Sequence, residues 1–222
     1  QFVGEPIGIV IADSIEIAKR AAKKIKIDYK PLPAIFDPRE AYKKGSLIMP
    51  PRIFSSGNVD EAWSKCDIIV EGKVESGGQE HLYLETQGSF AIPQEGGKIK
   101  IFSSTQSPTA VQRVAARILA VDMNNIEVDV LRLGGGFGGK EDQATPYAVM
   151  TALAALKLNR PIKLVLPRQE DMRITGKRHP YSSNWYSGKP AGKAAGRSQL
   201  LVSSMCWPLL DASRAACITS RT

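Results

Sequence analysis

The chain has 222 residues, of which 43% are hydrophobic, 23% are charged and 7% are aromatic. This is the composition of a globular protein, and it excludes wholesale disorder and collagen-like or mucin-like arrays. The length allows one or two domains, and no apolar run reaches the roughly 20 residues that a membrane-spanning helix requires.

The net charge is +8, from 30 Lys and Arg against 22 Asp and Glu, which would suggest an anionic partner. Residues 184–222 carry half of this excess, because five bases stand there against one acid, a difference of +4. These bases are scattered among Gly, Ala and Ser and form neither a basic helix nor an aromatic platform. We therefore do not expect the chain to bind nucleic acid.

The three cysteines, Cys66, Cys206 and Cys217, match no disulfide framework and no zinc-binding spacing. This cysteine usage favours a reducing, cytoplasmic compartment. An iron–sulfur cluster usually needs four thiolates, so we expect that this chain cannot hold one alone. The chain starts at Gln1 without Met, inside a strand-like run, which indicates a cut end.

The first 33 residues have the pattern of a strand–helix–strand unit. An apolar run at residues 7–12 predicts a buried strand, and Asp13 or Ser14 can cap the helix that follows. Apolar residues at helical spacing predict a helix over residues 15–25, and alternation predicts a strand over 25–29.

Strands and helices alternate again after residue 67. Strands are predicted at 68–74, 88–93, 98–103, 126–132 and 162–166, with a glycine turn at 94–97. A helix is predicted from Pro108, with one face formed by Val111, Val114, Ala115, Ile118 and Leu119, and a second helix over 146–158. The fold class is therefore α/β or α+β.

The composition and the periodicity of the sequence change at about Ser182. Residues 188–197 are small or basic and have no periodicity, and the apolar stretches beyond them are isolated. Two interpretations stay open: a flexible linker with a small docking segment, or a segment that is not native coding sequence, such as a shifted reading frame. We favour the second.

The most informative stretch is residues 134–141, Gly-Gly-Gly-Phe-Gly-Gly-Lys-Glu, between a predicted strand and a predicted helix. Glycines here allow backbone N–H groups to approach an anion or an oxo group closely. The stretch formally contains G-x-G-x-x-G, but no acidic residue follows about 20 positions on, as a dinucleotide site requires. It is also nearly a phosphate-binding loop, but Glu141 replaces the Ser or Thr that would bind magnesium. A purely structural glycine loop is the remaining alternative.

Four motifs in this order, at residues 78–87, 104–106, 134–141 and 170–180, resemble the molybdenum hydroxylases, the family of xanthine dehydrogenase and aldehyde oxidase. The resemblance covers residues 1 to about 181. It implies that residues 1–36 are the C-terminal part of a hammerhead-like α/β domain and 37–61 a linker. It also implies that 62–183 are the N-terminal part of the molybdopterin-binding domain. Residues 184–222 would then be an aberrant or flexible tail.

The resemblance also implies the site residues. Gln106 is similar to the glutamine whose amide hydrogen-bonds the oxo ligand of molybdenum, and Phe137 with Gly138 matches the loop that faces the other terminal ligands. Glu141 resembles the carboxylate that contacts a purine, since an enclosed carboxylic acid can stay protonated and donate a hydrogen bond. The alternatives are a helix-entry side chain for Gln106 and a solvated charge beside Lys140 for Glu141.

The residues at 85 and 178–179 also belong to these motifs, and we interpret them as structural. The family's general base and substrate-orienting arginines lie beyond the resemblance, so no residue here is assigned a catalytic role. The implied cofactor is molybdenum–molybdopterin, with iron–sulfur clusters and FAD on other domains or subunits.

The resemblance thus implies part of a cytoplasmic, oligomeric, xanthine dehydrogenase-like enzyme that oxidises a purine-like heterocycle. We expect no membrane contact and no activity from the 222-residue chain alone. The alternatives are an aldehyde oxidase-type hydroxylase and an inactive binding or scaffold fragment with a basic tail.

Overall fold

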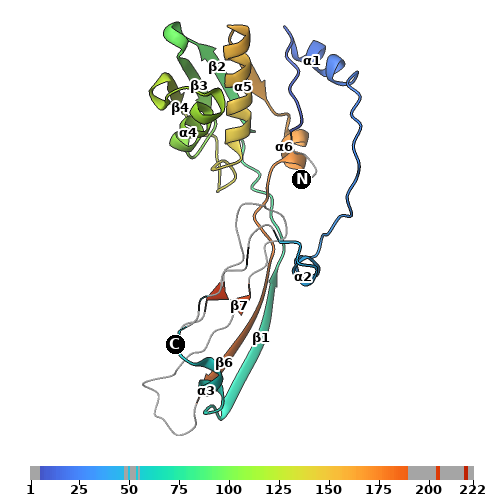
Figure 1. Cartoon of the computed structure of the whole chain (residues 1–222), viewed down its shortest axis with the longest axis vertical. Coiled ribbons are helices and arrows are strands. Elements are labelled where there is room, and N and C mark those ends of the chain that lie inside the picture. The colour runs from blue at the N-terminus through green and yellow to red at the C-terminus, as the bar shows by residue number, and fades with distance from the viewer. Residues whose placement is uncertain are drawn as a thin grey trace. The chain divides into compact units, whose positions relative to one another are not determined.

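The chain is described by a computed structural model, which covers residues 6–47, 50, 54, 56–189, 204–205 and 218–219 (Figure 1). The chain divides into two compact units. The first combines the stretch that ends at Pro31 with residues 80–177, and the second combines residues 32–79 with the chain from Arg178 onward.

The first unit is built on a four-stranded sheet in the order β4-β3-β2-β5. The strands are β2 (Gly88–Pro93), β3 (Ile99–Ser103), β4 (Ile126–Asp129) and β5 (Ile162–Val165). β2 is antiparallel to β3 and β5, whereas β3 and β4 are parallel and joined through a helix. The mixed α/β class predicted from the sequence is therefore confirmed.

The helices α4 (Pro108–Leu119) and α5 (Ala144–Leu158) pack against each other and against this sheet (Figure 1). Three alanines of α5 are fully buried, and their small side chains let the helix lie close to the strands. The shorter α6 (Arg168–Ile174) and the 3-10 turns η1 (Glu95–Gly97) and η2 (Met123–Asn125) complete the unit. The buried apolar core consists of Ala91, Ile99, Ile101, Val111, Ala115, Ala116, Ile126, Ala148, Ala152 and Ala155.

Most predicted elements of residues 80–177 are confirmed, with two corrections. β4 ends at Asp129 and does not reach residue 132, since its ladder with β3 ends at Phe102 opposite Asp129. Ile118, predicted on the buried face of α4, is 51% exposed because the buried face is formed by Val111, Ala115 and Ala116, and Ile118 lies at its edge.

The predicted strands at residues 7–12 and 25–29 are wrong. Between them lies only the helix α1 (Ile15–Ala22), and the Ser14 hydroxyl accepts a hydrogen bond from the Ile17 N–H at 3.3 Å, as a cap does. An isolated apolar run becomes a strand only when another strand pairs with it. Among the described residues, no strand pairs with either run.

The second unit contains a long antiparallel ribbon of β1 (Ile68–Ser76) and β6 (Tyr181–Lys189), called here the ribbon. Gly72 lies opposite Trp185, and the indole ring occupies the space that a side chain at residue 72 would need. The short helices α2 (Pro38–Lys43) and α3 (Val59–Trp63) and the two-residue strands β7 (Ser204–Met205) and β8 (Ile218–Thr219) also belong to this unit.

β6 extends to Lys189, into the segment predicted as a tail, and most of residues 190–222 lies outside the described residues. α2 lies within the predicted linker. None of the helices in the described residues has the length and hydrophobicity needed to cross a membrane.

Candidate cofactor-contacting loop

Two connections leave the sheet at the carboxyl ends of the parallel strands β3 and β4. Ligands of α/β proteins typically bind at this edge, because successive connections converge there. The first connection contains Gln106, and the second contains the glycine loop, defined as residues 134–141. The Gln106 N–H donates to the Lys140 carbonyl at 2.9 Å, and the Thr105 hydroxyl donates to the same carbonyl at 3.2 Å.

The Gln106 side chain holds the centre of the glycine loop. Its Oε1 accepts hydrogen bonds from the N–H groups of Gly138 and Lys140, each at 3.1 Å. A Cβ on Gly136 would lie 2.5 Å from Gln106 Cδ, so only glycine allows this approach. Because Oε1 already accepts two hydrogen bonds, Nε2 remains as the donor of an exposed carboxamide, with no hydrogen bond to another described residue.

The loop presents Phe137 at its tip. Phe137 has φ of +53°, which is unusual for a residue with a side chain, and it is 76% exposed. Gly138 has φ of +86°, and a Cβ placed there would meet nothing within 4 Å. The loop therefore offers an open face at residues 137–138, beside the Gln106 carboxamide.

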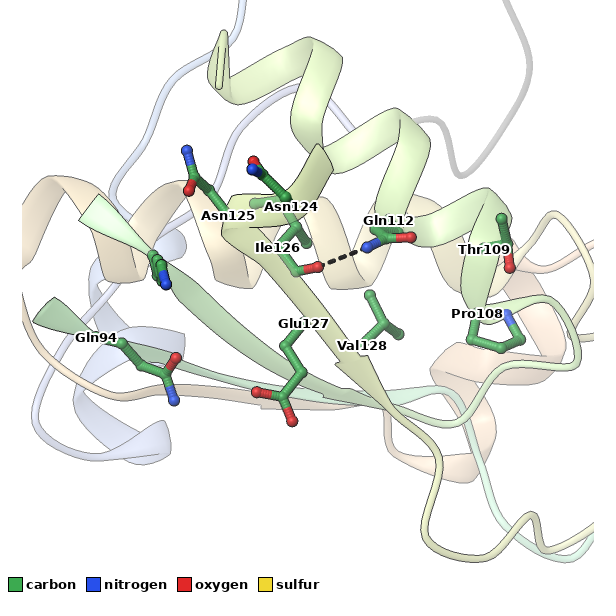
Figure 2. A pocket seen from close by; sticks show the side chains of 10 residues that line it. Gln94, Pro108, Thr109, Gln112, Asn124, Asn125, Ile126, Glu127 and Val128 are labelled. Atoms are coloured by element: carbon green, nitrogen blue, oxygen red, sulfur yellow. Dashed lines mark hydrogen bonds between the residues drawn. The ribbon is translucent and has the colours of Figure 1, made fainter. Parts of the chain in front are cut away.

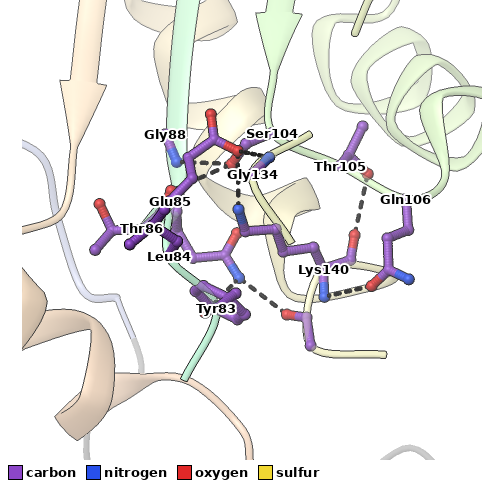
Figure 3. Close-up of polar contacts among 12 residues, drawn as sticks. Tyr83, Leu84, Glu85, Thr86, Gly88, Ser104, Thr105, Gln106, Gly134 and Lys140 are labelled. Carbon is purple, nitrogen blue, oxygen red and sulfur yellow. Dashed lines mark hydrogen bonds and ion pairs between the residues drawn. The ribbon is translucent and has the colours of Figure 1, made fainter. Parts of the chain in front are cut away.

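Beneath the loop lies a buried cation. The Lys140 side chain is fully buried, and its Nζ lies 3.0 Å from Glu85 Oε2 and 4.6 Å from the centre of the Tyr83 ring (Figure 3). Burial lowers the pKa of Lys140, while the hydrogen bond and the charge of Glu85 oppose this shift. The Gly134 N–H donates to the same Oε2 at 2.9 Å.

A second buried network fixes Tyr83. Its hydroxyl donates to Asp171 Oδ1 at 2.7 Å, and the Gln87 N–H donates to Asp171 Oδ2 at 2.6 Å. Burial, followed by the Asp171 hydrogen bond and charge, raises the pKa of Tyr83 far above its ordinary value. Gln87 Nε2 donates to the Gly139 carbonyl at 2.9 Å, which connects this network to the loop.

The structure brings Gln106, Phe137 and Gly138 together, as the resemblance implies. Glu141 ends the same loop, but its side chain is exposed in this chain, so the described residues do not enclose it. Among the described residues, no group of three or more His, Cys, Asp or Glu side chains is arranged to bind a metal ion directly.

A hollow of about 600 Å³ lies elsewhere, beside the edge strand β4 and the start of α4 (Figure 2). Its lining is mainly polar, and Gln112 Nε2 crosses it to the Ile126 carbonyl at 2.8 Å. None of the predicted site residues lines this hollow.

The sequence interpretation missed the burial of Lys140 and the role of Asp171. The sequence interpretation considered Lys140 only as a neighbour of Glu141, but the partner of Lys140 is Glu85, 55 residues earlier. Both Glu85 and Asp171 lie inside the recognised motifs, so their positions within those motifs were the available signal.

Residues 44–197 match the family model described as the molybdopterin cofactor-binding domain. The chain is 43% identical over 187 residues to the xanthine dehydrogenase/oxidase of Felis catus and 42% identical over 188 residues to aldehyde oxidase 2 of Rattus norvegicus. Each match covers 84% of this chain and 14% of the relative, so the chain spans about one seventh of the length of these curated relatives.

Solved structures share the fold. Quinoline 2-oxidoreductase from Pseudomonas putida 86 matches with a TM-score of 0.65 and 24% identity, over 78% of this chain and 23% of that chain. CO dehydrogenase from Oligotropha carboxidovorans matches with a TM-score of 0.67 and 22% identity, over 79% and 25%. The family model and the curated relatives show that the chain belongs to the xanthine dehydrogenase and aldehyde oxidase family of molybdenum hydroxylases, as part of its molybdopterin cofactor-binding domain.

Proposed function

We propose that the glycine loop and Gln106 form the protein side of a molybdenum–molybdopterin site. The observation that carries this proposal is the orientation of the Gln106 carboxamide. Two loop N–H groups bind Oε1, so Nε2 is fixed as a donor toward the open side of the loop. A donor in this place fits a cofactor with terminal oxygen or sulfur ligands, because such ligands accept hydrogen bonds.

The residues of this chain would bind and orient the group without ligating the metal themselves. Gln106 would donate from Nε2, and the backbone at Phe137 and Gly138 would lie against the neighbouring ligands, since a Cβ at Gly138 would meet nothing within 4 Å. When bound, molybdenum would supply two-electron redox chemistry. The rigid backbone of the loop would keep these donors in place.

For the intact protein, we propose oxidation of a purine or related heterocycle with oxygen derived from water. Glu141 supports this substrate class, because a carboxyl group can hydrogen-bond a heterocycle that carries N–H groups and carbonyls. An aldehyde is the alternative substrate, since aldehyde oxidase 2 is similar to this chain to nearly the same degree as the xanthine dehydrogenases.

Electrons would pass to iron–sulfur clusters and FAD on other domains or subunits of an oligomeric, cytoplasmic enzyme. We propose that the general base also lies outside this chain, since the family resemblance places it far toward the carboxyl end. The 222-residue chain alone should then catalyse no xanthine-dependent reduction of a dye.

The test uses the intact protein that contains this chain. Metal and pterin analysis should find one molybdenum and one pterin per protomer, and Gln106→Leu should reduce the turnover number about 10- to 100-fold. Gln94→Leu is the matched control, because Gln94 is exposed and its side chain has no hydrogen bond within the described residues. Absence of molybdenum and pterin from the intact protein as isolated, or equal activity in both variants, would contradict the proposal.

The same preparation tests the substrate. A higher kcat/KM for xanthine than for an aromatic aldehyde is the expected result. Activity with the aldehyde alone would favour the aldehyde oxidase alternative.

A further inference from the structure

We propose that Glu85 and Lys140 form a clamp that closes the glycine loop and positions its backbone. This inference rests on the proposed function of the loop and adds two positioning residues to it. Neither side chain needs to touch the cofactor or the substrate.

One carboxylate oxygen of Glu85 joins both ends of the loop. Glu85 Oε2 accepts from the Gly134 N–H at 2.9 Å and from Lys140 Nζ at 3.0 Å (Figure 3). The Glu85 N–H in turn donates to the Gly134 carbonyl at 3.0 Å. The first and the seventh residue of the loop are thus held at the same atom.

Lys140 depends on Glu85 because it is buried. Its side chain is fully buried, whereas that of Glu85 remains 42% exposed. A buried ammonium group without a partner is costly, and Glu85 is the acid that pairs with it in the described part of the chain. Lys140 therefore cannot move away from Glu85 without losing its compensating charge.

The Lys140 backbone connects the clamp to Gln106. The N–H of Lys140 donates to Gln106 Oε1, and its carbonyl accepts from the Gln106 N–H. A shift of the Lys140 backbone would therefore shift the carboxamide that also holds Gly138. The clamp thus acts on the open face of the loop through Gln106.

The clamp differs from an ordinary ion pair in its connection to the loop. Lys100 Nζ and Glu127 Oε1 also form an ion pair, at 2.6 Å, between the neighbouring strands β3 and β4. Lys100 Nζ also lies 3.6 Å from Asp129 Oδ2, all three residues belong to the sheet, and the Glu127 side chain is 55% exposed. This pair has the same chemistry without the connection to the loop, so it serves as the matched control.

The experiment compares Lys140→Met, Glu85→Gln and Lys100→Met in the intact protein. Hydrogen–deuterium exchange of peptides that cover residues 134–141 should accelerate at least about tenfold in Lys140→Met, with α5 peptides unchanged. Glu85→Gln should accelerate exchange less, because its amide oxygen still accepts from Gly134. Lys100→Met should leave the loop unchanged.

Activity provides the second measurement. We expect kcat to fall about 10- to 100-fold in Lys140→Met while KM stays within about twofold, because misplaced donors weaken the reaction more than substrate binding. The double variant with Glu85→Gln should lose little more than Lys140→Met alone, because both substitutions remove one unit.

Unchanged loop exchange in both clamp variants would overturn the proposal, as would equal effects from Lys100→Met. If Lys140→Met does not fold, the nearly isosteric Glu85→Gln decides, since its side chain is partly in solvent. Loop exchange does not depend on catalysis, whereas absence of molybdenum and pterin from the unmodified protein would contradict the proposed function alone.

Discussion

The four-stranded sheet with its helices and the ribbon of the second unit use similar apolar residues in different ways. In the sheet, Ile99 and Ile101 are buried to 1% exposure or less beneath α4 and α5. In the ribbon, Ile68 and Ile69 are each 55% exposed, although every residue of β1 lies opposite a residue of β6.

This comparison shows that backbone pairing and side-chain burial are separate requirements. A two-stranded ribbon satisfies its internal hydrogen bonds, but among the described residues no further strand pairs with β1 or β6, and many of their side chains stay exposed. The sheet of the first unit has such a layer, and its stability therefore depends on contacts within the described residues. We therefore expect exposed ribbon side chains such as Ile68 and Ile69 to contribute little to stability.

The sharpest test of this difference replaces one isoleucine in each region. Ile101→Ala should reduce the free energy of unfolding of the full chain by about 2–5 kcal/mol, because it leaves a cavity in a closed core. Ile69→Ala, on an exposed position of β1, should reduce it by less than about 1 kcal/mol. Urea denaturation measures both values, and equal losses would break the comparison.

A pair of glycines gives an intermediate effect. Gly136→Ala should destabilise the chain by about 1–3 kcal/mol, because the new Cβ would lie 2.5 Å from Gln106 Cδ and Oε1. Gly77 follows β1 in the second unit, and a Cβ there would meet nothing within 4 Å. Gly77→Ala should therefore change stability by less than about 0.5 kcal/mol. Thermal unfolding of the two variants checks this, and tolerance of Gly136→Ala would mean that Gln106 does not rest on the loop.

A third effect appears only at high pH. Burial, with a contribution from the charge of Asp171, raises the pKa of Tyr147 in α5 to about 12, so the folded state favours the neutral phenol. Its contribution to stability is complete below pH 10, the ordinary pKa of tyrosine, and is lost as the pH rises through 12. The loss should be about 1.4 kcal/mol per pH unit in this window.

Tyr147→Phe should remove this part of the alkaline loss, as measured by urea denaturation between pH 9 and pH 12. Val149→Ala, on the same helix and without a titratable group, is the control and should lower stability equally at each pH. An unchanged alkaline slope in Tyr147→Phe would contradict the burial of the phenol.

Local patterns predicted the sheet well and its surroundings poorly. The turn after β2 was predictable because Gly96 and Gly97 adopt positive φ, and α4 was predictable because Pro108 is suited to a helix start. The run at residues 7–12 looked equally strand-like, but strand formation depends on a partner that periodicity does not reveal.

The contacts of the candidate site were likewise predictable only in part. The proximity of Gln106 to the glycine loop was expected from the family motifs. The burial of Lys140 was not, because lysine is almost never fully buried unless it is paired, and its partner Glu85 is distant in sequence. No local pattern carries information about contacts of this range.

The two acceptor atoms that hold the glycine loop also have a consequence for how a cofactor would enter. Glu85 Oε2 and Gln106 Oε1 restrain residues 134, 138 and 140 through hydrogen bonds from groups of this chain, which require no ligand. Insertion would then carry little conformational entropy penalty at the loop, because its dihedral angles are already restricted. Residues 134–140 would thus behave as a rigid receptor, and any slow ordering during maturation would have to occur in other parts of the protein.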